Sequence, residues 1–95
     1  MKISIVGTGM IANEVAKALR AEAPEIDITA VCAHSNRTKA EAWAHDYDIP
    51  KGYDGYDEML REDDADFVYL GIVNTAHYSY ARRALQAHRN VIVEK

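Results

Sequence analysis

Two glycines and an alanine near the N-terminus form the pattern with the clearest chemical meaning in this chain. The run reads Gly7-Thr8-Gly9-Met10-Ile11-Ala12. It follows an apolar, β-branched segment and opens an amphipathic one, as a strand–turn–helix unit would. The first glycine permits a tight turn, and the second lets a phosphate approach the amides at the helix N-terminus. A small third residue lets helix and strand pack closely. The pattern predicts a diphosphate-binding turn.

The turn by itself leaves the class of ligand open. Sites for S-adenosylmethionine and flavin contain similar turns, and a tight turn can also occur with no ligand. In a repeating strand–helix pattern we expect the turn to hold the diphosphate of a nicotinamide dinucleotide. The expected contacts are Gly7, Thr8, Gly9, Met10 and Ile11.

The segment after the second strand should face the adenosine ribose. Asp27 lies about 20 residues beyond the turn, the usual distance of a ribose-binding acid, but it begins the strand, whereas ligands bind beyond the carboxyl ends. His34, Ser35 and Arg37 follow the strand, with no carboxylate among them. Ser35 and Arg37 could hydrogen-bond a 2′-phosphate, which favours NADP over NAD. The alternative for Arg37 is a solvated residue in the next helix.

Composition bounds the remaining possibilities. Ninety-five residues suit one small domain. The net charge is −4 with no basic stripe, so we expect no nucleic-acid partner. Apolar runs of about five residues are too short to span a membrane. The single cysteine, Cys32, excludes an internal disulfide framework, and the four histidines lack metal-ligand spacing. We expect a cytoplasmic protein without a metal site.

Short apolar runs alternate with helical patterns along the whole chain. Strands are expected at 3–6, 26–33, 51–53, 67–70 and 91–93, and helices at 11–19, 40–47, 56–61 and 81–88. This alternation predicts a doubly wound parallel sheet, a Rossmann fold, with five strands in the order 3-2-1-4-5. The last strand is expected to be buried. We place the acidic residues of 57–66 at the amino end of the sheet, away from any nucleotide.

Three separated motifs give the chain a specific family resemblance. The run 69–77, Tyr-Leu-Gly-Ile-Val-Asn-Thr-Ala-His, resembles the G-x-P-N-x-x-H segment of the Gfo/Idh/MocA oxidoreductases, with Val73 in place of the usual proline. The run 90–95, Asn-Val-Ile-Val-Glu-Lys, resembles the family's H-V-x-x-E-K-P. The run 36–44 is similar to the helix after the family's second strand. His34-Ser35 stand where NADP-using members often have Ser-Arg.

The resemblance implies roles for further residues. Asn74 and His77 would line the cofactor cleft, Glu94 would lie near the nicotinamide ribose, and Lys95 would be the family's lysine beside the site of hydride transfer. A lysine there can polarise or protonate a substrate oxygen. Residues 1–95 would be the NAD(P)-binding domain, truncated before a C-terminal substrate domain.

The function implied is hydride transfer between NAD(P) and a sugar, polyol or related hydroxy compound. The full-length protein would be the enzyme, and the 95 residues alone would be inactive. We expect a small-molecule substrate and a homo-oligomer, because the surface that meets the second domain should be apolar. The alternative is a non-catalytic NAD(P)-binding or regulatory module, which would dispense with Lys95. A methyltransferase with a similar turn is a weaker alternative.

Overall fold

The structure is a computed structural model that describes residues 1–72 and 74–93, without the side chains of 74–77. Strands and helices alternate along the chain. They are β1 Lys2–Val6, α1 Met10–Glu22, β2 Asp27–Cys32, α2 Arg37–Asp46, β3 Lys51–Tyr53, α3 Tyr56–Glu62, β4 Phe67–Leu70, α4 Asn74–Gln86 and β5 Asn90–Val93. The expected order of elements is confirmed, with α2 beginning and α4 ending earlier than the apolar pattern alone indicates.

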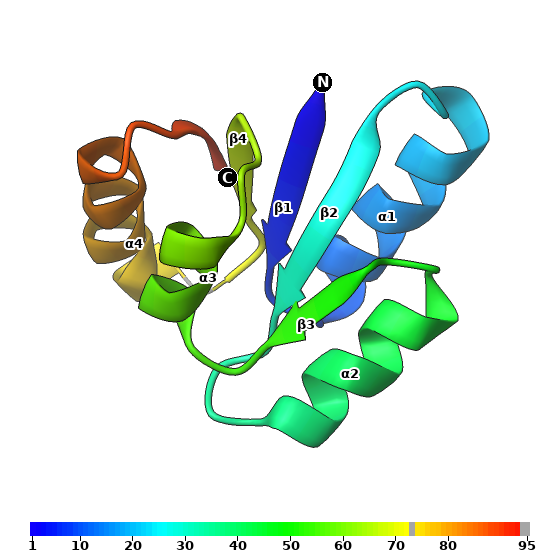
Figure 1. The fold of residues 1–95 in the computed structure, drawn as a ribbon, viewed down its shortest axis with the longest axis horizontal. Helices are drawn as coiled ribbons and strands as arrows, with labels where there is room; N and C mark the ends of the chain where they lie inside the picture. The colour runs from blue at the N-terminus through cyan, green and yellow to red at the C-terminus, as the bar shows by residue number, and fades with distance from the viewer. Residues whose placement is uncertain (73, 94–95) are drawn as a thin grey trace.

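The five strands form one parallel sheet in the order β3-β2-β1-β4-β5. Helices α1 and α2 lie on one side of the sheet and α3 and α4 on the other (Figure 1). This is the doubly wound Rossmann arrangement that the alternating pattern predicts. Each crossover carries the chain from the end of one strand over a face of the sheet to the start of the next.

Two apolar clusters fill the space between the sheet and its two helix layers. Successive residues of a strand point to opposite faces, so Ile5 packs in the cluster under α1 and α2, and Val6 packs in the cluster under α3 and α4. The central strands are therefore buried on both sides. Met59, the innermost residue of α3, is fully buried in the second cluster.

The inward face of α1 consists of small residues. Ala12 and Ala16 are fully buried, with Val15 and Leu19 partly buried beside them. The spacing of Ile11, Val15 and Leu19 in the sequence predicts an inward stripe that starts at Ile11, but Ile11 is 46% exposed. The prediction was wrong at this position because alanines one turn apart bring the helix backbone close to the sheet and rotate the larger side chains outward.

The last strand is an edge strand rather than a buried one. β5 pairs with β4 alone, and Ile92 and Val93 are 39% and 41% exposed. The apolar run was expected to indicate burial on both faces. Among the described residues, no further strand lies beyond β5, so these side chains keep contact with solvent.

The carboxyl ends of the central strands lie level with one another. Val6 at the end of β1 pairs with Cys32 of β2 on one side and with Leu70 of β4 on the other, and Cys32 pairs with Tyr53 at the end of β3. The loops that follow these strands therefore start at the same edge of the sheet, where open parallel sheets bind their ligands.

Candidate functional site

The first glycine of the turn is required by the fold. Gly7 has a φ of 109°, in the region that favours glycine. Its N–H donates to the carbonyl of Cys32 at 2.9 Å, which ties the turn to the neighbouring strand. A Cβ at this position would collide with the carbonyl oxygen of Gly71. Gly7 therefore allows three chain segments to meet at the carboxyl edge of the sheet.

The second glycine stands beside open space. Gly9 caps the N-terminus of α1 with φ −82° and ψ −169°, a conformation that other residues also adopt. A Cβ built on it would meet no described atom within 4 Å. No side chain caps α1, and its first turn contains no acidic residue. Its first amides thus have no partner within the helix, which fits the binding of a diphosphate.

The alanine at the end of the motif has the packing role expected from the pattern. Ala12 is fully buried, and a Cβ placed on Gly71 would lie 3.4 Å from the Ala12 Cβ. Helix α1 is therefore in close contact with the loop after β4. Met10 and Ile11, on the outer side of the same turn, are 78% and 46% exposed.

A hollow of about 250 Å³ adjoins the glycine turn. It opens where β1, β2 and β4 end, so that residues from several loops border one space. Its lining residues are Val6, Gly7, Thr8, Cys32, Ala33, His34, Asn36, Lys39, Ile72 and Tyr80. The structure therefore brings Gly7, Thr8 and His34 together as the sequence predicted, whereas Ser35 and Arg37 are not among the lining residues.

The loop after β2 is fastened to the loop after β3. Ser35 has a φ of 55°, and its N–H donates to the carbonyl of Asp54 at 2.9 Å. The guanidinium of Arg37 lies 3.1 Å from the carboxylate of Asp54, 3.4 Å from that of Glu58 and 4.0 Å from that of Glu41. The Asp54 carboxylate raises the pKa of Arg37.

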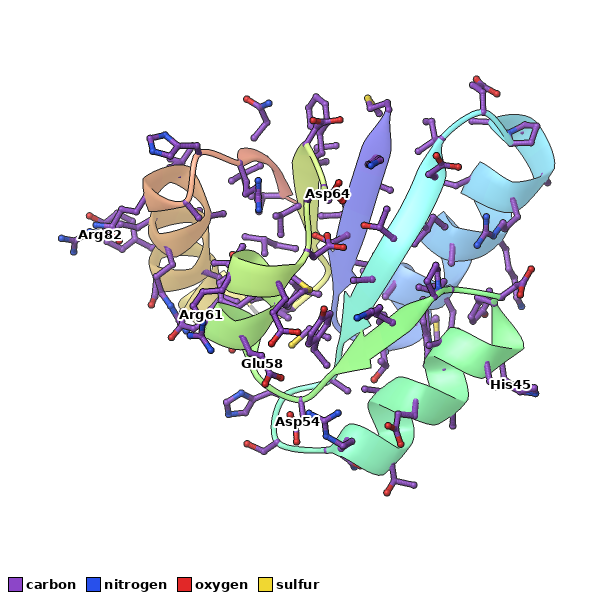
Figure 2. The ribbon with its side chains drawn as sticks, viewed as in Figure 1. His45, Asp54, Glu58, Arg61, Asp64 and Arg82 are labelled. Atoms are coloured by element: carbon purple, nitrogen blue, oxygen red, sulfur yellow. The ribbon has the colours of Figure 1, made fainter. Side chains whose placement is uncertain are left out.

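This arrangement corrects two expectations about carboxylates. Residues 33–37, directly after β2, contain no acid, but Asp54 reaches the same place from the end of the adjacent β3. Glu58 was assigned to the amino end of the sheet, but α3 starts where β3 ends, so Glu58 lies near the carboxyl end. Figure 2 shows Asp54 and Glu58 toward that end and Asp64 toward the opposite one. Asp64 pairs with Lys2 at the start of β1. Asp64 therefore lies at the amino end of the sheet, as expected.

The hollow is also lined by the polar residues Asn36, Lys39 and Tyr80, which were not among the predicted site residues. Asn36 is the N-cap of α2, and its side-chain oxygen accepts from the N–H of Lys39 at 3.0 Å. Tyr80 is held by Tyr56, whose ring stacks on it at 4.4 Å between centroids and whose hydroxyl donates to its carbonyl at 2.7 Å. The available signal was Asn36, a preferred N-cap residue that fixes the start of α2.

The remaining predicted site residues follow β4 and β5. Asn74 begins α4, and His77 lies in the first turn of that helix. The side chains of both residues lie outside the part of the chain that the structure describes. Three further residues lie outside the described part of the chain altogether. They are Glu94 and Lys95, which follow β5, and Val73, which stands where the family usually has proline.

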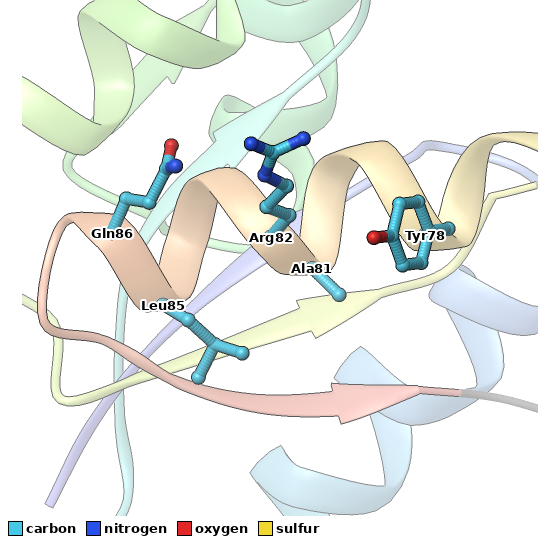
Figure 3. Close-up of a pocket in the computed structure, with 5 residues that line it drawn as sticks. All are labelled: Tyr78, Ala81, Arg82, Leu85 and Gln86. Carbon is cyan, nitrogen blue, oxygen red and sulfur yellow. The ribbon is translucent and has the colours of Figure 1, made fainter.

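A larger hollow of about 510 Å³ lies along α4. Its lining includes Tyr78, Ala81 and Leu85. Figure 3 shows Ala81 and Leu85 projecting to one side of the helix and Arg82 and Gln86 to another. The hollow is formed by one helix and lacks free amides, so it does not resemble a nucleotide site. Tyr78 and Leu85 are 79% and 61% exposed and give this face its apolar character.

Within residues 1–72 and 74–93, no three His, Cys, Asp or Glu side chains gather closely enough to hold a metal ion. Over the same residues, every helix is too short or too polar to cross a bilayer.

Known proteins with similar sequences are oxidoreductases. The trans-1,2-dihydrobenzene-1,2-diol dehydrogenase of Xenopus laevis is 34% identical over 96 residues, which cover 99% of this chain and 28% of that protein. The chain thus spans little more than a quarter of the length of this relative.

Solved structures agree in fold over the whole chain. Scyllo-inositol dehydrogenase from Lactobacillus casei, with bound NAD(H) and scyllo-inositol, superposes with a TM-score of 0.89 at 21% identity, covering 100% of this chain and 28% of that one. KijD10, a 3-ketoreductase from Actinomadura kijaniata in complex with TDP-benzene and NADP, has a TM-score of 0.89 at 28% identity, covering 100% and 29%.

The family comparison covers every residue. Residues 1–95 match the family described as "Oxidoreductase family, NAD-binding Rossmann fold". The glycine turn, the parallel sheet and the sequence motifs agree with that match. The chain belongs to the Gfo/Idh/MocA oxidoreductase family and carries its NAD-binding Rossmann fold.

Proposed function

We propose that this chain is the dinucleotide-binding part of an enzyme that transfers hydride between NAD(P) and a sugar, polyol or related hydroxy compound. One observation carries the proposal. The N-terminus of α1 has no side-chain cap, and a Cβ added to Gly9 would meet no described atom within 4 Å, so the space beside the first amides is open. Neither the backbone conformation at this position nor the packing of neighbouring atoms requires a glycine. The space it leaves is explained by a diphosphate seated on the amides.

The proposal assigns the carboxyl edge of the sheet to two parts of the cofactor. Residues 7–11 bind the diphosphate through the turn and the first amides of α1. His34 borders the adenosine ribose at the end of β2, with Ser35 and Arg37 in the segment behind it. The hollow of about 250 Å³ between these segments supports this placement, because it connects the glycine turn to the loop after β2.

The residues after β4 and β5 complete the proposed site. Asn74 and His77 line the cleft beside the cofactor, and Glu94 lies near the nicotinamide ribose. A bound nicotinamide supplies the capacity to accept or donate a hydride. Lys95 then acts as the proton donor or acceptor at its Nζ for the oxygen of the substrate, which is the role of a general acid–base residue.

The names of similar proteins support the substrate class. A dihydrodiol dehydrogenase and an inositol dehydrogenase both act on hydroxyl-bearing rings. We propose a related small hydroxy compound for this protein, held largely by residues beyond this chain. Since similar structures hold NAD(H) or NADP, the preference for NADP rests on cationic residues near the end of β2.

We also propose that the protein forms a homo-oligomer. The support is the exposed apolar face of α4 and β5, with Tyr78, Leu85, Ile92 and Val93. A surface of this kind favours contact with another protein surface over solvent.

Titration with NADPH, NADH and S-adenosylmethionine tests the proposed function. The two nicotinamide cofactors should bind to the folded protein and S-adenosylmethionine should not. Gly9→Ala should weaken both cofactors by about tenfold or more, since one lost charge-assisted hydrogen bond has roughly that effect.

Gly55→Ala is the matched control. Gly55 is also an extended N-cap, here of α3, and a Cβ on it would make only an ordinary contact of 3.7 Å with Glu58. Affinity should be unchanged in this variant. Equal effects of Gly9→Ala and Gly55→Ala, or a wild-type protein that binds neither nicotinamide cofactor, would contradict the proposal.

A further inference from the structure

The cations near the end of β2 differ in what they face. Arg37 and Lys39 both lie in the first turn of α2. Lys39 borders the hollow beside the glycine turn, and Arg37 does not. Lys39 is also the only Lys or Arg among the described residues of that lining. A phosphate placed in the hollow on the adenosine ribose side therefore meets Lys39 before any other cation.

The charge of Arg37 is already balanced. Its guanidinium lies within 4.0 Å of the carboxylates of Glu41, Asp54 and Glu58. To pair with a phosphate, Arg37 would have to leave those partners or accept a fourth anion beside them. Arg37 is better placed to offset Asp54 in the loop after β3 and Glu58 in α3, which would otherwise repel a phosphate.

The charge of Lys39, by contrast, is not balanced by a neighbouring carboxylate within the part of the chain that the structure describes. Over the described residues, its ammonium forms no ion pair with a carboxylate. Its backbone is fixed, because the N–H of Lys39 donates to the Asn36 side chain at 3.0 Å. The residue thus combines a fixed Cα position with a free charge on a flexible stem. Lysine commonly binds phosphate as a point charge of this kind.

We propose that Lys39, rather than Arg37, is the residue that selects NADP by pairing with its 2′-phosphate. Arg37 has a positioning role, since it neutralises Asp54 and Glu58 and ties the start of α2 to the loop after β3 and to α3. This inference rests on the proposed function, because it assumes that a nicotinamide dinucleotide occupies the hollow.

Affinities of NADPH and NADH for variants of the intact protein test the inference by calorimetry. Lys39→Ala should weaken NADPH about 10- to 100-fold, as expected for the loss of a charge-assisted contact, and leave NADH within about threefold. Arg37→Ala should have a smaller effect on NADPH. Lys17→Ala removes the same charge from an exposed position two turns along α1, and should change neither affinity.

Two further measurements separate a charge effect from a structural one. The affinity of NADPH should fall more steeply with salt than that of NADH, and Lys39→Ala should remove the difference. The fragment 2′,5′-ADP should lose affinity in Lys39→Ala, and ADP should not. Far-ultraviolet circular dichroism and the melting temperature should match the wild type.

The inference is overturned if Lys39→Ala weakens NADPH and NADH equally, if Arg37→Ala has the larger effect on NADPH, or if the wild type binds only NADH. In the last case the proposed function still stands. Binding of neither cofactor by the wild type is a separate result that overturns the proposed function itself.

Discussion

The guanidinium of Arg37 lies 3.1 Å from the carboxylate of Asp54, so a cation at the start of α2 is paired with an anion from the loop after β3. The two residues are 17 positions apart in the chain. Asp54 thereby brings a negative charge to the carboxyl edge of the sheet, although the loop after β2 contains no acidic residue. It also decides how much positive charge is available to a nucleotide.

Asp54→Asn should strengthen the binding of NADPH. The substitution keeps the backbone carbonyl that accepts from Ser35 and removes the charge that occupies Arg37. Because the pair is partly exposed, the expected gain in affinity is modest, about two- to fivefold, with NADH nearly unchanged. Asp64→Asn removes a carboxylate at the opposite end of the sheet and should leave both affinities unchanged. Tighter binding of both cofactors in Asp54→Asn would contradict this electrostatic explanation.

The strand order and the glycine turn could be predicted from sequence because both depend on local patterns. Apolar runs of strand length alternate with helical periodicity, and a right-handed crossover between parallel strands leaves few arrangements. Gly7 and Gly9 were identifiable because a tight turn and a phosphate approach need glycine at those spacings.

The arrangement of charges near the ends of β2 and β3, where we propose that the adenosine ribose binds, could not be predicted in the same way. Asp54 and Arg37 meet because β2 and β3 end level, which no local pattern contains. Lys39 resembles any exposed helix lysine until the hollow is known. Ile11 and Ile92 were misplaced for a related reason, since apolar character does not reveal which face a neighbouring element covers.

Gly7→Ala should lower the free energy of unfolding by more than about 2 kcal/mol, because it combines a positive φ with overlap against the Gly71 carbonyl. Urea denaturation followed by circular dichroism measures the change. Gly9→Ala is the comparison variant and should unfold at nearly the wild-type midpoint. Equal stability of Gly7→Ala and the wild type would show that the turn can relax.

Lys95→Ala in the longer protein should lower kcat by about 10²- to 10⁴-fold, which is the usual contribution of a general acid–base residue. Cofactor affinity should be largely kept. Steady-state kinetics with NADPH and a separate binding titration distinguish the two effects. Unchanged turnover would favour the alternative of a non-catalytic NAD(P)-binding or regulatory module.

The thiol of Cys32 should give the protein a specific pH dependence. Burial raises its pKa from an ordinary value of 9.0 to about 11. At neutral pH the thiol is protonated in both the folded and the unfolded chain. As the pH rises from 9 toward 11, the unfolded chain loses this proton first, so stability falls.

The difference between wild type and Cys32→Ala isolates this effect from other groups that titrate at high pH. Urea midpoints measured from pH 7 to pH 11 should converge or cross as the pH rises, because the wild type alone has the thiol. Parallel curves for the two proteins would show that burial does not shift the pKa as described.

Leu85→Glu should reduce self-association of residues 1–95. Leu85 is 61% exposed on the apolar side of α4, so a charge there should cost little stability but disfavour burial in an interface. Light scattering over a range of concentrations measures the effect. Gln86→Glu introduces the same charge on another side of the helix and serves as control. A wild-type chain that stays monomeric at all concentrations would contradict the expectation.

The level ends of β1, β2 and β4 have a consequence for how such a protein can change over evolutionary time. Each loop begins from a strand end that the sheet fixes independently of that loop. The segment after β2 can therefore acquire or lose a charge while the diphosphate seat after β1 keeps its shape. Cofactor preference can in this way diverge between related proteins through a few substitutions, without any need to rebuild the sheet.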